Sequence, residues 1–104
     1  MAASAQVIPL EGEIDLHVSP RIANTLNAAL KEQPRNLIVD LSRVSYIDSS
    51  GLAVLIEAMQ NAERYGGKFA LAALQENVKP IFEIARLDQV FRIFPDVQSA
   101  SDPG

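Results

Sequence analysis

The sequence predicts an α/β domain with a mixed, mostly parallel sheet of about five strands and three to four helices. Three observations lead to this prediction. Short apolar runs alternate with helical patterns, the run LIVDL at 37–41 is continuously aliphatic, and glycine or proline separates the segments. Strands joined by helical crossovers form parallel sheets, and a strand that is apolar on both faces belongs in the middle of such a sheet.

The first two strands are predicted to form a hairpin. QVIPL at 6–10 is a short apolar run, and Pro9 places it at a sheet edge because proline has no N–H for the strand ladder. Gly12 then marks a turn. Beyond it, apolar residues alternate with polar ones in EIDLHV: Ile14, Leu16 and Val18. This period of two is typical of a hairpin partner strand.

A helix and the central strand follow. Ser19 is a hydroxyl N-cap and Pro20 suits the first helical position, so a helix is expected to begin here and to end at Pro34. Apolar residues recur along it at helical spacing: Ile22, Leu26 and Leu30. The strand at 37–41 then has the composition of one that is covered on both faces.

The second half of the chain continues the alternation. After DSSG at 48–51, an apolar stripe predicts a helix that Gly66–Gly67 ends. Three further segments complete the order: a strand at 68–74, a helix capped by Asn77 and running through about Leu87, and a strand at 91–94. The small polar residues from 98 to 104 are expected to form a flexible, frayed tail.

Composition narrows the classes of function. The 104 residues predict one domain, and a net charge of −4 with scattered lysines and arginines argues against nucleic-acid binding. The absence of cysteine and the single histidine, His17, leave little for a metal site or a catalytic triad. No secretory signal pattern and no bilayer-spanning apolar run is visible, so we expect a cytoplasmic protein with no direct membrane insertion.

The turn DSSG lies where the central strand ends, which is where open α/β sheets usually carry function. Ser49 or Ser50 could be a helix N-cap that contributes roughly 1 kcal/mol, although Asp48 could cap the helix unaided. A nucleophilic serine lacks the surrounding glycines of a nucleophile elbow, and His17 would have to be its only base. A phosphate-binding loop needs several glycines and a lysine, and this turn has one glycine and no adjacent lysine.

A fourth hypothesis is that one serine accepts a phosphate from another protein. A helix N-terminus tolerates the added negative charge because its N–H groups and its dipole favour anions. Phosphoserine adds about −1.5 to −2 charges at pH 7, and beside Asp48 it would repel an acidic partner surface and crowd a close-packed one. The residues alone do not choose between Ser49 and Ser50.

Three segments resemble one family. LIVDLSRVSYIDSSGLAVLIEAM resembles the central segment of STAS domains of the bacterial anti-sigma factor antagonist type. LEGEIDLHVSP is similar to that family's G-E-[IL]-D strand and first helix, and GGKFALAALQENVKPIFEIARLDQVFRIFPD resembles its later strand, third helix and last strand. The resemblance covers about residues 7–97 and implies a single STAS domain over 1–104.

The resemblance implies a phosphorylation switch. The unphosphorylated antagonist binds an anti-sigma factor that is also a serine kinase, and the sigma factor is released. The kinase then phosphorylates the antagonist, and a serine phosphatase resets the cycle. Carried onto this chain, the acceptor is Ser49 rather than Ser50. The expected partner-binding residues are Asp15, Asp48, Ser49, Ser50 and Gly51, and neither catalytic residues, a metal nor a cofactor are expected.

A second hypothesis uses the same fold without a switch. The small STAS subunit of an ABC-type lipid-transport complex resembles this chain and can also keep a hydroxyl residue in the turn. The two hypotheses differ in whether modification of the serine turn changes partner binding.

Overall fold

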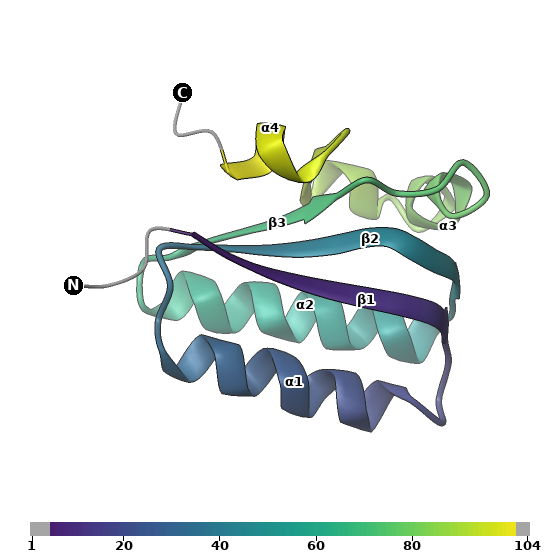
Figure 1. Cartoon of the computed structure of the whole chain (residues 1–104). Coiled ribbons are helices and arrows are strands. Elements are labelled where there is room, and N and C mark those ends of the chain that lie inside the picture. The colour runs from purple at the N-terminus through teal and green to yellow at the C-terminus, as the bar shows by residue number, and fades with distance from the viewer. Residues whose placement is uncertain (1–4, 102–104) are drawn as a thin grey trace.

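The computed structural model describes residues 5–101, which form a four-stranded sheet with helices on both faces (Figure 1). All strand pairs are parallel, and the strand order is β1-β2-β3-β4. The strands are β1 (Ala5–Ile14), β2 (Asn36–Ile47), β3 (Lys68–Ala72) and β4 (Arg92–Phe94). The helices are α1 (Ser19–Lys31), α2 (Ser49–Arg64), α3 (Lys79–Ile84), the short 3-10 helix η1 (Leu87–Gln89) and α4 (Val97–Ser101). The predicted α/β class is confirmed, with one strand fewer than expected.

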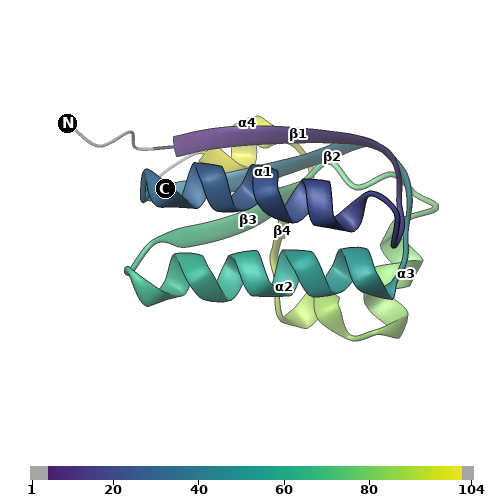
Figure 2. The same ribbon diagram turned by 90° about the horizontal axis from the view of Figure 1, so that it is seen from below.

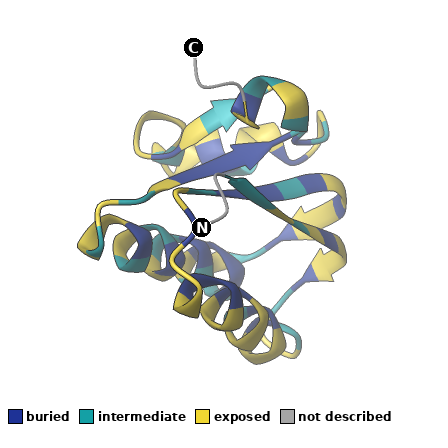
Figure 3. Ribbon diagram, turned by 60° about the vertical axis from the view of Figure 1, so that its left-hand side comes forward, coloured by how far each residue is buried: buried dark blue, intermediate teal, exposed yellow. Residues whose placement is uncertain are grey.

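The sheet has a main core on one face and a smaller one on the other. Helices α1 and α2 lie side by side under the sheet, and α4 lies over the opposite face (Figures 1 and 2). Alternate side chains of β2 divide between the two sides: Leu37, Val39 and Leu41 join the main core, while Ile38 joins the cluster with Ala100 of α4. The four aliphatic residues of the run at 37–41 are therefore fully buried, on both faces of the sheet, as predicted. Figure 3 shows buried residues, in dark blue, along the strands between the helices.

The predicted opening hairpin is wrong. Residues on both sides of Gly12 belong to one strand, β1, which pairs in parallel with β2 from end to end. Gly12 has a φ of +82°, and the pairing register shifts just before and just after it. Gly12 thus accommodates a strand irregularity rather than a chain reversal, since a residue without a Cβ serves either purpose.

The start of α1 also differs from the prediction. Val18 rather than Ser19 is the N-cap residue, and the Ser19 side chain makes no capping hydrogen bond and is buried. Asp15 organises the turn instead, because its carboxylate accepts hydrogen bonds from the N–H groups of His17 (3.0 Å) and Val18 (3.3 Å). An aspartate that bonds the backbone two residues ahead is a common way to make such a turn.

Two predictions about the carboxyl-terminal half need correction. Helix α3 is shorter than expected, and Asn77 does not cap it: the Asn77 amide donates to the Ser45 carbonyl of β2 (2.8 Å). The tail was predicted to fray from 98 onward, but Val97–Ser101 is helical. Ala100 in this helix is fully buried, and its carbonyl accepts a hydrogen bond from the Asn36 amide (2.9 Å). The remainder of that predicted tail, 102–104, lies outside the described residues.

Within residues 5–101, none of the helices is both long enough and apolar enough to cross a bilayer.

Candidate functional site at the serine turn

The carboxyl ends of β1 and β2 bring two turns together. Ile14 and Ile47 are paired in the sheet, and the Asp48 N–H donates to the Ile14 carbonyl at 3.0 Å. The turn that follows β1 and contains Asp15 therefore lies next to the turn that contains Asp48 and Ser49. Parallel pairing is the cause, because it places the carboxyl ends of neighbouring strands at one edge of the sheet.

Asp48 is the N-cap of α2. One of its carboxylate oxygens, Oδ1, accepts hydrogen bonds from the N–H groups of Ser50 (3.0 Å) and Gly51 (3.1 Å). The same oxygen accepts a third bond from the Ser50 hydroxyl at 2.6 Å. These bonds satisfy two of the N–H groups that a helix start leaves without partners. The hypothesis that a serine caps this helix is therefore wrong.

The hydrogen bonds also keep Asp48 ionised. The Ser50 hydroxyl and then the Gly51 N–H lower the pKa of Asp48 below its ordinary value. Partial desolvation acts in the opposite direction, and the N–H groups of Ser50 and Leu16 add smaller lowering effects. A carboxylate that accepts several hydrogen bonds is stabilised in its charged form. The serine turn therefore carries a full negative charge at neutral pH.

The two serines have different surroundings. Ser49 is exposed at the first residue of α2, and no hydrogen bond of its hydroxyl is found within residues 5–101. Ser50 is half-buried, and its hydroxyl proton is directed at Asp48. The structure thus distinguishes two residues that the sequence alone left equivalent.

Gly51 lies where the start of α2 passes close to the ends of β1 and β2. A Cβ at this position would lie 2.7 Å from Ile47 Cγ1 and 2.8 Å from Ile14 Cγ2. Both distances are shorter than carbon atoms tolerate without movement, so a side chain here would displace the Ile14 and Ile47 side chains or α2. The glycine therefore sets how closely Ser49 follows the strand ends.

Asp15 has a local task in the turn after β1. Its carboxylate is occupied by the His17 and Val18 N–H groups, and its own carbonyl accepts from the Ser19 N–H at 2.9 Å. It borders the same edge of the sheet as Asp48. The side chain is half-buried.

One residue beside the site was missed by the sequence analysis. The alternation Ile14, Leu16, Val18 placed Leu16 in a strand, yet β1 ends at Ile14 and the Leu16 side chain is 70% exposed in the following turn. The signal that could have revealed it is Asp15, because an aspartate favours a turn at the point where a strand pattern ends.

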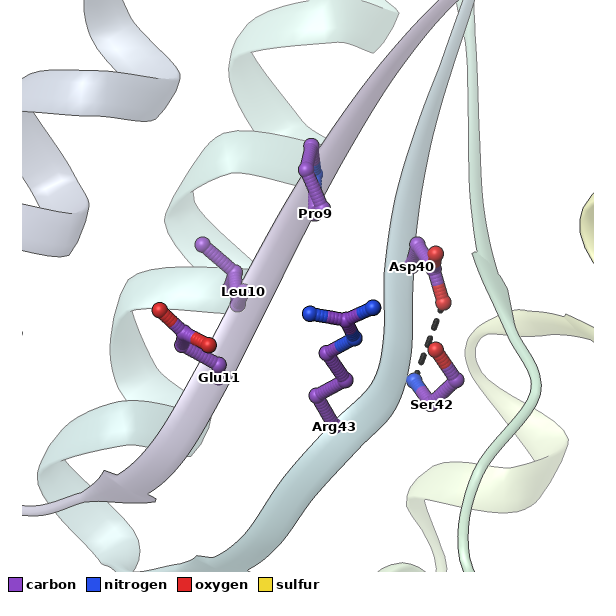
Figure 4. A pocket seen from close by; sticks show the side chains of 6 residues that line it. All are labelled: Pro9, Leu10, Glu11, Asp40, Ser42 and Arg43. Carbon is purple, nitrogen blue, oxygen red and sulfur yellow. Dashed lines mark hydrogen bonds between the residues drawn. The ribbon is translucent and has the colours of Figure 1, made fainter.

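Neither a metal-ligand cluster nor a pocket offers a stronger candidate site within residues 5–101. In the part of the chain that the structure describes, no three His, Asp or Glu side chains are grouped as metal ligands. A pocket of about 380 Å³ is lined by residues of β1 and β2, and Figure 4 shows Arg43 among the side chains that line it. The polar bond drawn there is local, from the Ser42 N–H to the Asp40 carboxylate at 2.9 Å. The serine turn remains the better candidate site.

Comparisons with known proteins agree with the fold. Residues 3–100 match the STAS domain family. The chain is 31% identical over 97 residues to the anti-sigma-B factor antagonist of Bacillus subtilis, covering 93% of this chain and 84% of the relative. It is 30% identical over 82 residues to the anti-sigma-B factor antagonist of Listeria monocytogenes, covering 79% of this chain and 72% of the relative. The crystal structure of an anti-sigma factor antagonist from Mycobacterium paratuberculosis is also similar, with a TM-score of 0.84, 26% identity, and coverage of 93% and 82% of the two chains.

Proposed function

The chain belongs to the STAS domain family, and on that premise we propose that it is an anti-sigma factor antagonist switched by phosphorylation of Ser49. In the unphosphorylated form it binds an anti-sigma factor that is also a serine kinase, and a sigma factor is released. Phosphorylation ends this binding, and a serine phosphatase restores it. These partners place the protein in the cytoplasm. Relatives named anti-sigma-B factor antagonist support the general role.

One observation carries the choice of acceptor. The Ser49 hydroxyl is exposed at the start of α2, whereas the Ser50 hydroxyl is bound to Asp48 at 2.6 Å. A kinase has to reach the attacking oxygen and remove its proton. Ser49 meets both requirements without a change in the turn, while Ser50 would first have to give up its hydrogen bond.

The position at a helix start suits a reversible modification. Negative charge at the first residue of a helix interacts favourably with the helix dipole, which offsets repulsion from Asp48. The phosphate therefore leaves the fold intact. A partner packed closely against Ser49 would have to accommodate the added group and its water, so binding suffers more than folding.

Phosphate mapping tests the proposal. The chain is incubated with the serine-kinase anti-sigma factor of the same organism and ATP, and the modified residue is identified by mass spectrometry. We expect one phosphate on Ser49, none on Ser49→Ala, and normal labelling of Ser50→Ala as the matched control. Absence of label from both serines in the wild-type chain would refute the proposal, and label on Ser50 alone would refute the choice of acceptor.

The alternative of a non-switching STAS subunit in an ABC-type lipid-transport complex predicts a different result. Its serine turn would remain unlabelled by a kinase, and partner binding would not respond to charge at Ser49.

A further inference from the structure

The turn between β1 and α1 presents an exposed aliphatic side chain beside the candidate phosphorylation site. Leu16 is 70% exposed. The described residues include four other large hydrophobic residues that are clearly exposed: Val7, Tyr46, Ile84 and Val90. Of these, Tyr46 also lies near the serine turn, two residues before Asp48 and paired with Glu13 of β1. A single exposed leucine is ordinary, but one in this place can serve a docking surface.

Hydrogen bonds hold Leu16 in a defined position. The Asp15 carboxylate binds the N–H groups of the two residues that follow Leu16, and the Leu16 carbonyl accepts from the Ser19 hydroxyl at 3.4 Å. A side chain displayed from a turn with a set backbone loses little conformational freedom on binding. Leu16 therefore has the properties of a binding anchor.

The turn that carries Leu16 lies next to the serine turn. The Asp48 N–H bonds the Ile14 carbonyl, two residues before Leu16, and the Leu16 N–H contributes to the low pKa of Asp48. A partner that covers Ser49 would therefore lie against the neighbouring turn, which carries Leu16.

The charges nearest these turns are mostly negative. Residues 12–20 and 44–55 contain three carboxylates, those of Glu13, Asp15 and Asp48, while the nearest basic residues in sequence, Arg21 and Arg43, lie just outside these ranges. A complementary partner surface is basic, because opposite charges steer association and like charges oppose it.

We propose that Leu16 is the apolar anchor of the Ser49 docking surface, and that the partner receives it in an apolar pocket bordered by lysine or arginine. This inference rests on the proposed function, since it describes the surface of the same partner. It adds the residue that supplies the apolar contact and the chemistry of the opposing surface.

The inference changes how phosphate releases the partner. Against a basic surface, the charge of phosphoserine would attract rather than repel. Release then comes from volume and hydration: a phosphate at Ser49 and its bound water prevent the close contact in which Leu16 is buried. Charge repulsion by an acidic partner, which the sequence alone allowed, is not required.

Binding of purified variants to the anti-sigma factor of the same organism tests the inference, by calorimetry at low and high salt. We expect Leu16→Ala to bind at least about tenfold more weakly than wild type. Leu16→Met, which keeps the apolar volume, should stay within about threefold. The matched control is Val7→Ala, an exposed aliphatic residue at the other end of β1, roughly 20 Å from the strand end at about 3.3 Å per residue. We expect it to stay within about twofold of wild type.

Each outcome decides one statement. If Leu16→Ala bound within twofold of the wild-type affinity, the role of Leu16 would be overturned. Equal losses of affinity in Leu16→Ala and Val7→Ala would overturn it as well. Affinity that does not fall as salt rises would overturn the basic pocket. Failure of the unphosphorylated wild-type chain to bind would instead overturn the proposed function, and the anchor with it. Because Leu16 is so exposed, we expect Leu16→Ala to unfold at the same thermal midpoint as wild type. A loss of affinity would then reflect a lost contact with the partner and not a loss of folding.

Discussion

At the serine turn, the Asp48 carboxylate caps α2, binds the Ser50 hydroxyl and leaves Ser49 exposed. Asp48 thus makes the two serine hydroxyls differ, because it accepts a hydrogen bond from Ser50 and none from Ser49. Gly51 completes the arrangement, because any side chain there would meet Ile14 and Ile47. The four residues of the DSSG turn therefore have four different surroundings, although two of them are serines.

The low pKa of Asp48 predicts a pH-dependent contribution to stability. Because the pKa is lower in the folded chain than in the unfolded one, the contribution is complete above the unfolded value, near pH 4, and is lost as the pH falls through the folded value. We expect Asp48→Asn to be less stable than wild type at pH 6, with a difference that shrinks below about pH 4. Urea unfolding between pH 2 and 7 measures this.

A second aspartate provides a control for the pH experiment. Asp96 lies outside the serine turn, and the Ser99 N–H lowers its pKa. The stability lost in Asp96→Asn should therefore also shrink as the pH falls. A difference between wild type and Asp48→Asn that stayed constant down to pH 2 would contradict the assignment.

Among the elements, the short helix α4 covers the smaller of the two hydrophobic cores. Its Ala100 is fully buried against Ile38, Ala70 and Ala72, on the face of the sheet that α1 and α2 do not cover. Small side chains on β3 allow this helix to lie close to the sheet. The Asn36 amide ties β2 to the Ala100 carbonyl across 64 residues of sequence.

Introducing a charge into this contact is expected to destabilise the fold. Ala100→Asp places a carboxylate at a fully buried position, which costs at least about 2 kcal/mol of unfolding free energy. Gln98→Glu, at an exposed position of the same helix, should change it by less than about 0.5 kcal/mol. Denaturant titration of both variants checks this. Similar stabilities for the two would mean that α4 does not contribute to the folded core.

For the whole molecule, the proposed partner-binding surface lies apart from the packed cores. The cores lie along the sheet, while Leu16, Asp48 and Ser49 lie at its carboxyl edge, where the two turns meet. Changes at this edge can therefore alter binding and leave the packed interior unchanged. That separation is what a reversible switch on a small domain requires.

Ser49→Asp tests the separation. We expect it to weaken binding to the anti-sigma factor by about 2–3 kcal/mol, because a hydrated carboxylate cannot enter a close-packed contact without losing water. Its unfolding free energy should change by less than about 0.5 kcal/mol, because negative charge suits the first residue of a helix. Calorimetric binding and thermal unfolding give the two values. Ser49→Ala should bind like wild type, and equal binding by Ser49→Asp would contradict the switch.

The sequence by itself determined the alternation of strands and helices, the central strand at 37–41 and a helix start at DSSG, which the structure places at Ser49. These follow from local periodicity and from caps, which short segments contain in full. Only the tertiary structure decided that Gly12 bends one strand instead of reversing the chain, that α4 covers Ile38, and that the exposed residues Leu16 and Ser49 lie on neighbouring turns. Each of these depends on contacts between residues distant in sequence. A glycine, a small polar helix or an alternating leucine is locally compatible with more than one environment, and packing against the rest of the chain selects among them.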